Sequence, residues 1–536
     1  MAYVALPGSN RQLLPDSRPA GPVDPSEIAD LTIHVRSKGD LEALERQVSE
    51  DAKRPVSERR YLTHDELASQ YGASKEDLDK LEAYARQYDL VVLHRSAAER
   101  SLVLQGTLGD LRAAFPANVQ IYHHAAGTYR GRTGEISVPE ELSGIITGIF
   151  GFDTRPKQRA PYHRKQASLA GPGGQNGVAA TEFAARYNFP PSLNGTQLTG
   201  AGETVAIIEL GGGFRMTDLK AFFNEIASPV PTVTAVSVDK AGNHPTTPES
   251  ADGEVMLDIE VAGAVVPEAR FAIYFGPNSG DKGFIDAISA AVHDSERKPS
   301  VLSISWGAPE DLLPKASINA YHALFVAAAS LGITVCAASG DHGAADEDAI
   351  HWDGKIHVNH PTSDPFVLAC GGTQVQNGED VVWNDGTPFD RSVPGGGGWT
   401  TGGGISVVFP VPDYQRTTTL PKSINNTPVG RGVPDIAMSA TNYFTRVDRA
   451  EGASGGTSAV APLMSALVAR LNQAKQKPVG FINPFLYANA AKNIVHDVIS
   501  GNNAITNTVK GYDAELGWDA CTGLGTPDGQ AILDGI

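Results

Sequence analysis

The chain has 536 residues, of which 41% are hydrophobic and 19% charged, and this composition excludes a wholly disordered protein. Its 43 Lys and Arg against 61 Asp and Glu give a net charge of −18, which argues against a nucleic acid or an anionic membrane as partner. No run of 18 apolar residues occurs, so we expect no membrane-spanning helix.

The first part of the chain has the pattern of a small α+β domain. Strands are expected at 30–36, 90–95, 101–106 and 118–124, and helices at 40–50, from 63, at 75–88 and near 109–115. Thr63 and Glu66 form a capping box at the start of the second helix. The β-α-α-β-β-α-β order predicts a small α+β (ferredoxin-like) domain over residues 1–153.

A segment without periodicity follows at 154–178. It is basic and then rich in Gly, as is typical of an exposed linker that proteases cut. The charge balance also changes here: residues 1–170 carry 22 Lys and Arg against 23 Asp and Glu, whereas residues 171–536 carry 21 against 38. This difference indicates two functional parts. Most carboxylates of the second part lack a cationic partner, so their protonation breaks few stabilising ion pairs. This favours function at low pH.

The second part, 179–536, alternates apolar strands with helices. Strands are expected at 203–209, 270–275, 300–305, 332–338 and 366–370, and helices at 216–227, 253–264, 282–294 and 315–331. This order predicts an α/β fold with a doubly wound parallel sheet, in which ligands bind at the carboxyl ends of the strands. The three cysteines, Cys336, Cys370 and Cys521, form no CxxC pair, which excludes a disulfide scaffold and a cysteine-based zinc site.

The first candidate for chemistry is Ser458, in the motif GGTSAVAP (455–462). Small residues lead directly into an Ala- and Leu-rich helix, which places Ser458 in its first turn, beside unpaired N–H groups and the positive end of the helix dipole. Such surroundings can activate a hydroxyl and stabilise an oxyanion. The alternative is a serine that merely caps a buried helix, and the full motif disfavours it.

A serine nucleophile needs a base, and the His-Gly-Thr string of His-dependent enzymes with this serine motif is absent. In its place, Glu254 and Asp258 are spaced i,i+4 on one helix face. A buried pair of this kind shares a proton, which raises one pKa and lets the pair serve as base and orienting partner in acid. A solvated acidic face is the alternative.

Asp341 follows the strand expected at 332–338, in the string Ser339-Gly340-Asp341. That position is at the edge of the sheet where this fold places active sites. A protonated carboxyl there could donate a hydrogen bond to an oxyanion, which an ionised Asp cannot do. An ordinary turn is the alternative.

Together these features resemble the sedolisin family of serine-carboxyl peptidases, in its kumamolisin-like branch, over nearly the whole chain. The strings that carry the resemblance are ELGGG (209–213), DGEVMLDIEVAGA (252–264), SISWG (303–307), SGD (339–341), LACGGT (368–373), VWNDG (382–386), RGVPD (431–435), GGTSAVAP (455–462) and GWDACTGLG (517–525). The resemblance implies a subtilisin-like catalytic domain behind a prodomain that is cleaved off in acid.

The resemblance also implies roles for individual residues. Ser458 would be the nucleophile, Glu254 the general base and acid, and Asp258 the partner of Glu254. Asp341 would be the protonated oxyanion donor. The supporting residues Glu209 and Trp306 match family positions that extend the hydrogen-bond network beyond Asp258.

One structural Ca²⁺ ion is implied as well, with matching positions at Asp497, Val498, Glu515, Gly517 and Asp519. Two carboxylates with main-chain carbonyls are the hard oxygen ligands that calcium prefers. Glu515 stands where the family pattern has Gly, and a main-chain carbonyl ligand tolerates this change if φ is not positive. An acidic loop without metal is the alternative.

Asn359 and His360 are the candidate substrate-binding residues, in the string His-Val-Asn-His-Pro (357–361). In the family this segment lines the primary specificity pocket, and an Asp at the position of Asn359 can favour basic side chains. We therefore expect a weaker preference for Arg and Lys and better acceptance of Gln before the cut. Neutral variation in a loop is the alternative.

The leading hypothesis is an acid-active, monomeric endopeptidase that cleaves peptides and proteins. We expect its prodomain to be an intramolecular inhibitor that detaches when acid weakens carboxylate contacts, with self-cleavage near 165–180. The N-terminus lacks the pattern of a signal peptide, yet secretion into acidic surroundings is expected. The alternatives are a non-catalytic binding protein on a degenerate peptidase fold, or a His-dependent hydrolase active at neutral pH.

Overall fold

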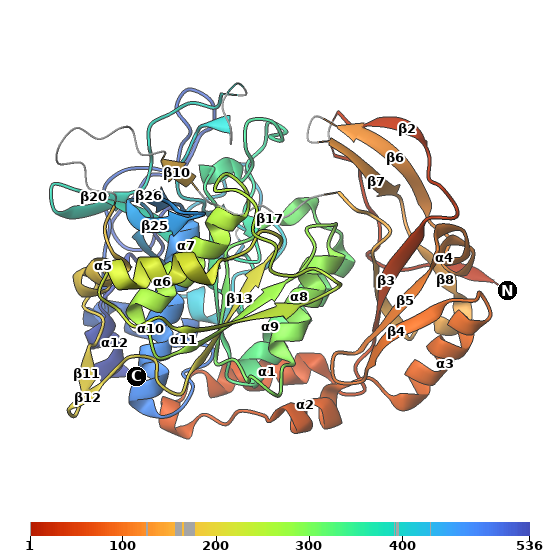
Figure 1. Cartoon of the computed structure of the whole chain (residues 1–536), viewed down its shortest axis with the longest axis horizontal. Coiled ribbons are helices and arrows are strands. Elements are labelled where there is room, and N and C mark those ends of the chain that lie inside the picture. The colour runs from red at the N-terminus through yellow and green to blue at the C-terminus, as the bar shows by residue number, and fades with distance from the viewer. Residues whose placement is uncertain are drawn as a thin grey trace.

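The computed structural model describes residues 2–14, 16–124, 127–155, 163–165, 177–390, 392, 396–428 and 430–536. Most of the linker expected at 154–178, and much of the region expected to contain the cut, therefore lies outside the described residues. The chain forms an N-terminal domain, the expected prodomain, and a larger domain, the expected catalytic domain. Helices of the N-terminal domain extend beneath the larger one (Figure 1).

The prodomain is built on a four-stranded antiparallel sheet in the order β4-β5-β3-β9, with a second sheet β2-β6-β7 beside it. Its strands are β1 (Tyr3–Ala5), β2 (Arg18–Pro22), β3 (Ile28–Val35), β4 (Val91–Ser96), β5 (Ser101–Thr107), β6 (Asn118–His124), β7 (Gly127–Thr133), β8 (Ser137–Pro139) and β9 (Ile146–Phe150). Its helices are α1 (Leu41–Asp51), α2 (His64–Tyr71), α3 (Lys75–Arg86) and α4 (Leu108–Ala114). The expected α+β class and the capping box at Thr63 and Glu66 are confirmed. The strand expected at 118–124 forms, but it lies in the second sheet, and β9 completes the main one.

The catalytic domain has the expected parallel sheet, in the order β14-β15-β13-β16-β18-β20, with β24 parallel to β20 and β21 antiparallel to it. The strands are β13 (Thr204–Glu209), β14 (Thr232–Ser237), β15 (Arg270–Phe275), β16 (Val301–Ile304), β18 (Thr334–Ala338), β20 (Leu368–Gln376), β21 (Glu379–Val382) and β24 (Ile436–Ser439). The apolar pattern of the sequence does not predict β14. Its side chains are exposed or half-buried because it is an edge strand that pairs only with β15, so it lacks the apolar run of a central strand.

Helices cover both faces of this sheet. They are α5 (Ala180–Arg186), α6 (Met216–Glu225), α7 (Asp252–Val265), α8 (Lys282–Val292), α9 (Lys315–Ser330), α10 (Val460–Lys475), α11 (Asn483–Asn489) and α12 (Gly529–Gly535). Alternate residues of β13 point to opposite layers: Val205 and Ile207 pack with α7 and α10, whereas Ala206 and Ile208 pack with α8 and α9. The sheet is therefore buried on both sides, as its apolar strands predict.

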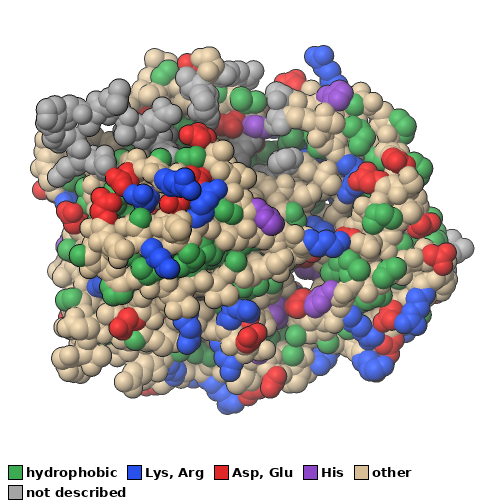
Figure 2. Space-filling view, viewed as in Figure 1, with side chains coloured by type: hydrophobic (Ala, Val, Ile, Leu, Met, Phe, Trp, Pro, Cys, Tyr) green, Lys and Arg blue, Asp and Glu red, His purple; other side chains and the backbone are tan. Residues whose placement is uncertain are grey.

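The prodomain docks on the α8 and α9 side of the catalytic domain. Leu44 and Val48 of α1 belong to the same apolar cluster as α9, so the core continues across the boundary. Buried Arg11 of the prodomain pairs with Asp281 of the catalytic domain, with 2.9 Å between Nη1 and Oδ2. In Figure 2 a hollow separates parts of the two domains, and Lys and Arg side chains lie among Asp and Glu on this face.

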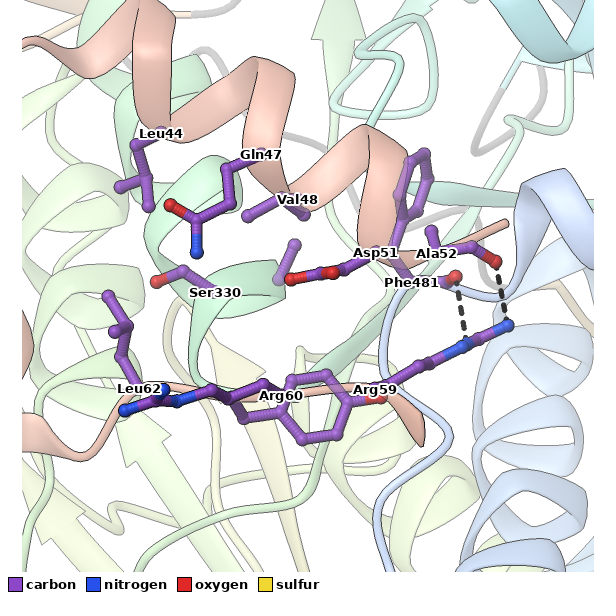
Figure 3. A pocket seen from close by; sticks show the side chains of 12 residues that line it. Leu44, Gln47, Val48, Asp51, Ala52, Arg59, Arg60, Leu62, Ser330 and Phe481 are labelled. Atoms are coloured by element: carbon purple, nitrogen blue, oxygen red, sulfur yellow. Dashed lines mark hydrogen bonds between the residues drawn. The ribbon is translucent and has the colours of Figure 1, made fainter. Parts of the chain in front are cut away.

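A small pocket marks the lower part of this boundary (Figure 3). Leu44, Gln47 and Val48 of α1 line one side, and Ser330 and Phe481 of the catalytic domain line the other. The Arg59 guanidinium donates to the main-chain oxygen of Ala52 at 2.8 Å and to that of Phe481 at 3.4 Å. The pocket is thus part of the docking interface.

Two sequence expectations about composition can be compared with the described residues. All three cysteines are free and buried, and Cys336 and Cys370 lie in the apolar strands β18 and β20. Within the described part of the chain, no helix has the length and apolar character needed to cross a membrane.

Candidate active site

The predicted catalytic residues gather at the carboxyl ends of three neighbouring strands and on α7. β13 ends at Glu209, β16 is followed directly by Ser305 and Trp306, and β18 leads into Asp341. Because parallel strands end at one edge of the sheet, residues far apart in sequence converge there.

Ser458 lies in a short 3₁₀ turn, Thr457–Ala459, which runs directly into α10. The turn is possible because Gly456 adopts a φ of 117°, a conformation that other residues rarely take. The Ser458 side chain is buried, and its hydroxyl makes no hydrogen bond among the described residues. It therefore serves no capping role, which removes the structural alternative.

Glu254 and Asp258 lie on α7, every residue of which is buried, so the alternative of a solvated acidic face is wrong. Burial raises the pKa of Glu254 well above its ordinary value, and the charges of Asp258 and Glu209 raise it further. Burial likewise raises the pKa of Asp258 and of Glu209. These three carboxyls form one coupled cluster that holds protons at a pH where isolated carboxyls are ionised.

Two hydrogen-bond donors hold this cluster. The Ser305 hydroxyl donates to Asp258, with Oγ 3.1 Å from Oδ1 and 3.0 Å from Oδ2. The Trp306 indole Nε1 donates to Glu209 Oε2 at 3.0 Å. Trp306 was expected from the sequence, whereas Ser305 was not, although its place directly after an apolar strand could have indicated it.

The Ser458 hydroxyl faces the Glu254 carboxyl. Burial raises the pKa of Glu254, and the nearby hydroxyl opposes part of that rise. Neither the Ser458 hydroxyl nor the Glu254 carboxyl meets the criteria for a hydrogen bond among the described residues, so the two groups are close without being hydrogen-bonded. Catalytic hydrogen bonds are often long in the absence of substrate and tighten in the reacting complex. The arrangement can therefore pass a proton from the serine to the carboxyl.

Asp341 contacts the first residue of the serine turn. The main-chain N–H and the hydroxyl of Thr457 both donate to its Oδ1, at 2.8 and 2.9 Å. Its Oδ2 is buried and makes no hydrogen bond within the described structure. Burial raises the pKa of Asp341 well above its ordinary value despite the two bonds from Thr457. One oxygen is thus fixed, and the other is available to carry a proton toward a substrate carbonyl.

The two candidate substrate-binding residues point in different directions. β19 (Asn359–His360) pairs with β17 (Ala308–Pro309), which continues the segment that carries Trp306. Successive side chains of a strand face opposite sides. His360 packs among aromatic rings, 5.0 Å from that of Tyr321, whereas the Asn359 amide donates to Asp346 Oδ1 at 3.1 Å. Asp346 is an acidic neighbour of Asn359 that no motif in the sequence indicates.

The five candidate calcium positions come together in one loop region. The Gly517 N–H donates to Asp497 Oδ2 at 2.7 Å, and the Glu515 N–H approaches Asp519 Oδ2 at 3.4 Å. Glu515 is not among the residues with positive φ, and Val498 is buried beside Asp497. Burial raises the pKa of Asp519 to about 6, so this carboxylate lacks charge compensation. No group of three or more His, Cys, Asp or Glu suited to a metal occurs among the described residues. A site here would combine two carboxylates with main-chain carbonyls, which is a donor set that calcium accepts.

Comparisons with known proteins agree with this architecture. The family described as "Pro-kumamolisin, activation domain" matches residues 15–155, and the "Subtilase family" matches residues 239–518. The chain is 40% identical to kumamolisin of Bacillus sp. (strain MN-32), over 99% of this chain and 96% of that protein. It is 27% identical to sedolisin of Pseudomonas sp. (strain 101), over 93% of this chain and 85% of that protein. The solved structure of Pseudomonas sedolisin complexed with two molecules of pseudo-iodotyrostatin matches with a TM-score of 0.58 and 28% identity, over 68% of this chain and 98% of that chain.

The parallel sheet, the serine turn ahead of α10 and the activation domain define a subtilase-type serine endopeptidase that is made as a zymogen. Within that class the chain belongs to the sedolisin family of serine-carboxyl peptidases, and kumamolisin and sedolisin are its relatives.

Proposed function

We propose that this chain is an acid-active serine-carboxyl endopeptidase that processes itself and then cleaves peptides and proteins. The observation that carries the proposal is that the group facing the Ser458 hydroxyl is the buried carboxyl of Glu254, which is coupled to Asp258 and Glu209. A carboxyl can act as a base in acid, where a histidine would be protonated.

The proposed reaction has two halves. Ser458 Oγ attacks the peptide carbonyl carbon while Glu254 takes the hydroxyl proton, and protonated Asp341 donates a hydrogen bond to the carbonyl oxygen as it becomes negative. Glu254 then gives the proton to the departing amine as the C–N bond breaks, which leaves an acyl-serine. Water, deprotonated by Glu254, hydrolyses the ester and restores Ser458.

This assignment sets the pH dependence. Activity needs Glu254 ionised and Asp341 protonated. Because burial raises the pKa of Asp341, the donor persists to higher pH than an exposed Asp would, and activity is lost as pH rises through that raised pKa. As pH falls, the Glu254 cluster takes up its protons and the base is lost.

A digest of a peptide library at several pH values, with Ser458→Ala as control, tests the proposal. A rate maximum above pH 7 would favour the His-dependent alternative.

Self-processing is supported by the described part of the linker. β10 (His163–Lys165) pairs antiparallel with β26 (Ala450–Gly455), and β26 leads directly into the turn that holds Ser458. An extended segment added to the edge of a strand is a common way of binding peptides. The linker thus reaches the neighbourhood of the nucleophile in an extended, substrate-like form.

Acid can release the prodomain through a buried histidine. His34 on β3 lies in a pocket that Ala316 and Ala320, both of the catalytic domain, help to close. Burial lowers the pKa of His34 to about 3, with a further lowering by Arg100. Exposed histidine titrates near pH 6.5. An undocked state that exposes His34 therefore binds more protons, and docking weakens as pH falls below that value.

An ion-pair cluster beside the interface, formed by Asp153 with Arg11 and Arg155, responds differently. Burial alone would raise the pKa of Asp153, but Arg11 and Arg155 lower it below its ordinary value. A carboxyl whose pKa is lowered in the folded state stabilises that state until the pH falls through the lowered pKa. The Asp153 ion pair therefore persists near pH 4. Asp153 is therefore a weaker candidate for the acid trigger than His34.

We expect His34→Gln to shift self-conversion to lower pH, because the substituted side chain cannot gain a proton on release. The ratio of conversion rates at pH 4 and pH 6, read from gels, should fall by about tenfold or more. His123→Gln, at an exposed prodomain histidine, is the matched control and should leave the ratio unchanged. An unaltered ratio in His34→Gln would rule out this trigger.

We also propose one structural Ca²⁺ ion at Asp497 and Asp519 with the carbonyls of Val498, Glu515 and Gly517. When bound, the ion would supply positive charge to the buried Asp519 carboxylate and tie the two loops together. We expect saturating Ca²⁺ to raise the Tm of the mature enzyme by about 5 °C, since a ligand at 100 times its Kd contributes about 2.7 kcal/mol. Asp497→Asn should remove most of that increase, and an equal increase in this variant would place the ion elsewhere.

Secretion and a monomeric state remain predictions from the sequence.

A further inference from the structure

The Ser305 hydroxyl lies among three acceptors and carries a single hydrogen. Its Oγ is 3.1 and 3.0 Å from the two carboxyl oxygens of Asp258 and 3.3 Å from the main-chain oxygen of Ser458. All three residues are fully buried, so bulk solvent does not compete for these contacts. A hydroxyl donates one hydrogen and can also accept, so Ser305 can give its hydrogen either to Asp258 or to the Ser458 carbonyl.

The main-chain carbonyl of Ser458 lacks its usual helical donor. In an α-helix a carbonyl accepts from the N–H four residues later. Four residues after Ser458 stands Pro462, in the first turn of α10, and proline has no N–H. The proline of the GGTSAVAP motif therefore leaves the carbonyl of the proposed nucleophile open to the Ser305 hydroxyl.

The groups that face Asp258 are other carboxyls and this one hydroxyl. Glu254 lies on the same helix and Glu209 at the end of β13, and Asp341 acts on Glu254 from the end of β18. Burial raises the pKa of Asp258, and the Ser305 hydroxyl opposes part of that rise. Because the coupled carboxyls share protons, Asp258 is present both as a carboxylate and as a carboxylic acid over the working pH range.

From this geometry we propose that Ser305 is a positioning residue whose hydrogen bond reverses when Asp258 gains or loses a proton. When Asp258 is ionised, Ser305 donates to it. When Asp258 is protonated, the carboxyl O–H donates to Ser305 Oγ, and Ser305 turns its own hydrogen to the Ser458 carbonyl. Asp258 is thus held in both forms, and the serine turn stays tied to the carboxyl cluster. This inference rests on the proposed peptidase function and extends it to a residue outside that cluster.

Ser305→Ala tests this role, and Ser303→Ala is the matched control. Ser303 lies two residues earlier on β16, is equally buried, and its hydroxyl makes no hydrogen bond among the described residues. A hydrogen bond to a charged group is roughly twice as strong as a neutral one. Loss of the Ser305 hydroxyl therefore destabilises ionised Asp258 more than protonated Asp258, and the cluster keeps its protons to higher pH.

The kinetic readout is the pH profile of kcat on a small peptide, with each chain converted in acid. For Ser305→Ala we expect kcat to fall by about tenfold, KM to stay within about twofold, and the acidic limb to move up by about one pH unit. Ser303→Ala should leave kcat and the limb unchanged. Ser305→Cys keeps the size of the side chain with a weak S–H donor, so its limb should lie between those of wild type and Ser305→Ala. This variant carries the test if Ser305→Ala does not fold.

Stability distinguishes a reversing bond from a fixed donor. The unconverted Ser458→Ala chain is the background, and the loss of Tm on adding Ser305→Ala is followed from about pH 3 to about pH 8. A fixed donor contributes only while Asp258 is ionised, so its loss would cost nothing at the acidic end. A reversing bond serves both forms, so we expect Tm to fall by about 2 °C throughout.

Three results would each overturn the inference: an acidic limb that stays in place in both Ser305 variants, an equal shift in Ser303→Ala, or a loss of Tm confined to high pH. If wild type cuts no peptide at any pH, or shows no acidic limb, the proposed function itself fails. If wild type shows the limb and the Ser305 variants do not move it, only the role of Ser305 fails.

Discussion

Replacement of Ser458 by Ala should abolish both peptide cleavage and the conversion of the zymogen. In a related subtilase, loss of the serine nucleophile lowers kcat by about 10⁶-fold, and we expect a loss of this order. The Ser458 hydroxyl makes no hydrogen bond among the described residues, so its removal breaks no contact that holds the fold. Loss of activity can therefore be separated from loss of structure.

The measurement compares wild type with Ser458→Ala after brief incubation near pH 4. Wild type should pass from 56.4 kDa to about 38 kDa, in proportion to the length left after the exposed linker is cut, and the variant should stay at 56.4 kDa. The Tm of the two unconverted chains should agree. Self-cleavage by pure Ser458→Ala would show that Ser458 is not the nucleophile. Cleavage of the variant by added wild-type enzyme would not contradict that role.

The sequence predicts the fold of this chain well wherever a strand is buried on both sides. β13, β15 and β18 appear as continuous apolar runs because helices cover both faces of the sheet. β14 was missed for the same physical reason, since an edge strand with exposed side chains carries no such run. β6 was found but its sheet was not, because strand pairing depends on contacts between residues distant in sequence.

In the candidate site, too, the residues in local motifs can be predicted from the sequence, and those that depend on distant contacts cannot. Ser458, Glu254 and Asp341 each stand in a motif whose local chemistry indicates a role. Asp346 stands in an acidic loop whose sequence resembles any solvated turn, and only folding brings it to Asn359. His34 has an ordinary strand sequence, and its lowered pKa follows from burial in the folded chain. Properties that arise from contacts between distant segments are therefore the ones that cannot be predicted from local sequence patterns.

Glu254→Gln should lower kcat by about 10³ to 10⁴-fold, the contribution of a well-placed general base, with little change in KM. Gln keeps the size of Glu254 and its place on α7, but it cannot accept the serine proton. Unlike Ser458→Ala, this variant keeps the nucleophile, so a slow residual acylation should remain. Removing this carboxyl also relieves the repulsion by Asp258 and Glu209 that raises the pKa of Glu254, so the free energy of unfolding should not fall.

The pH profile distinguishes a base from a merely structural carboxyl. In wild type the rate should fall at low pH as the Glu254 cluster gains its protons, and in Glu254→Gln that acidic limb should flatten while the loss at higher pH, set by Asp341, remains. Asp258→Asn is the matched comparison: it should lower kcat less and shift the acidic limb without removing it. A Glu254→Gln enzyme with more than about a tenth of wild-type kcat, or with an unchanged acidic limb, would assign the base to another group.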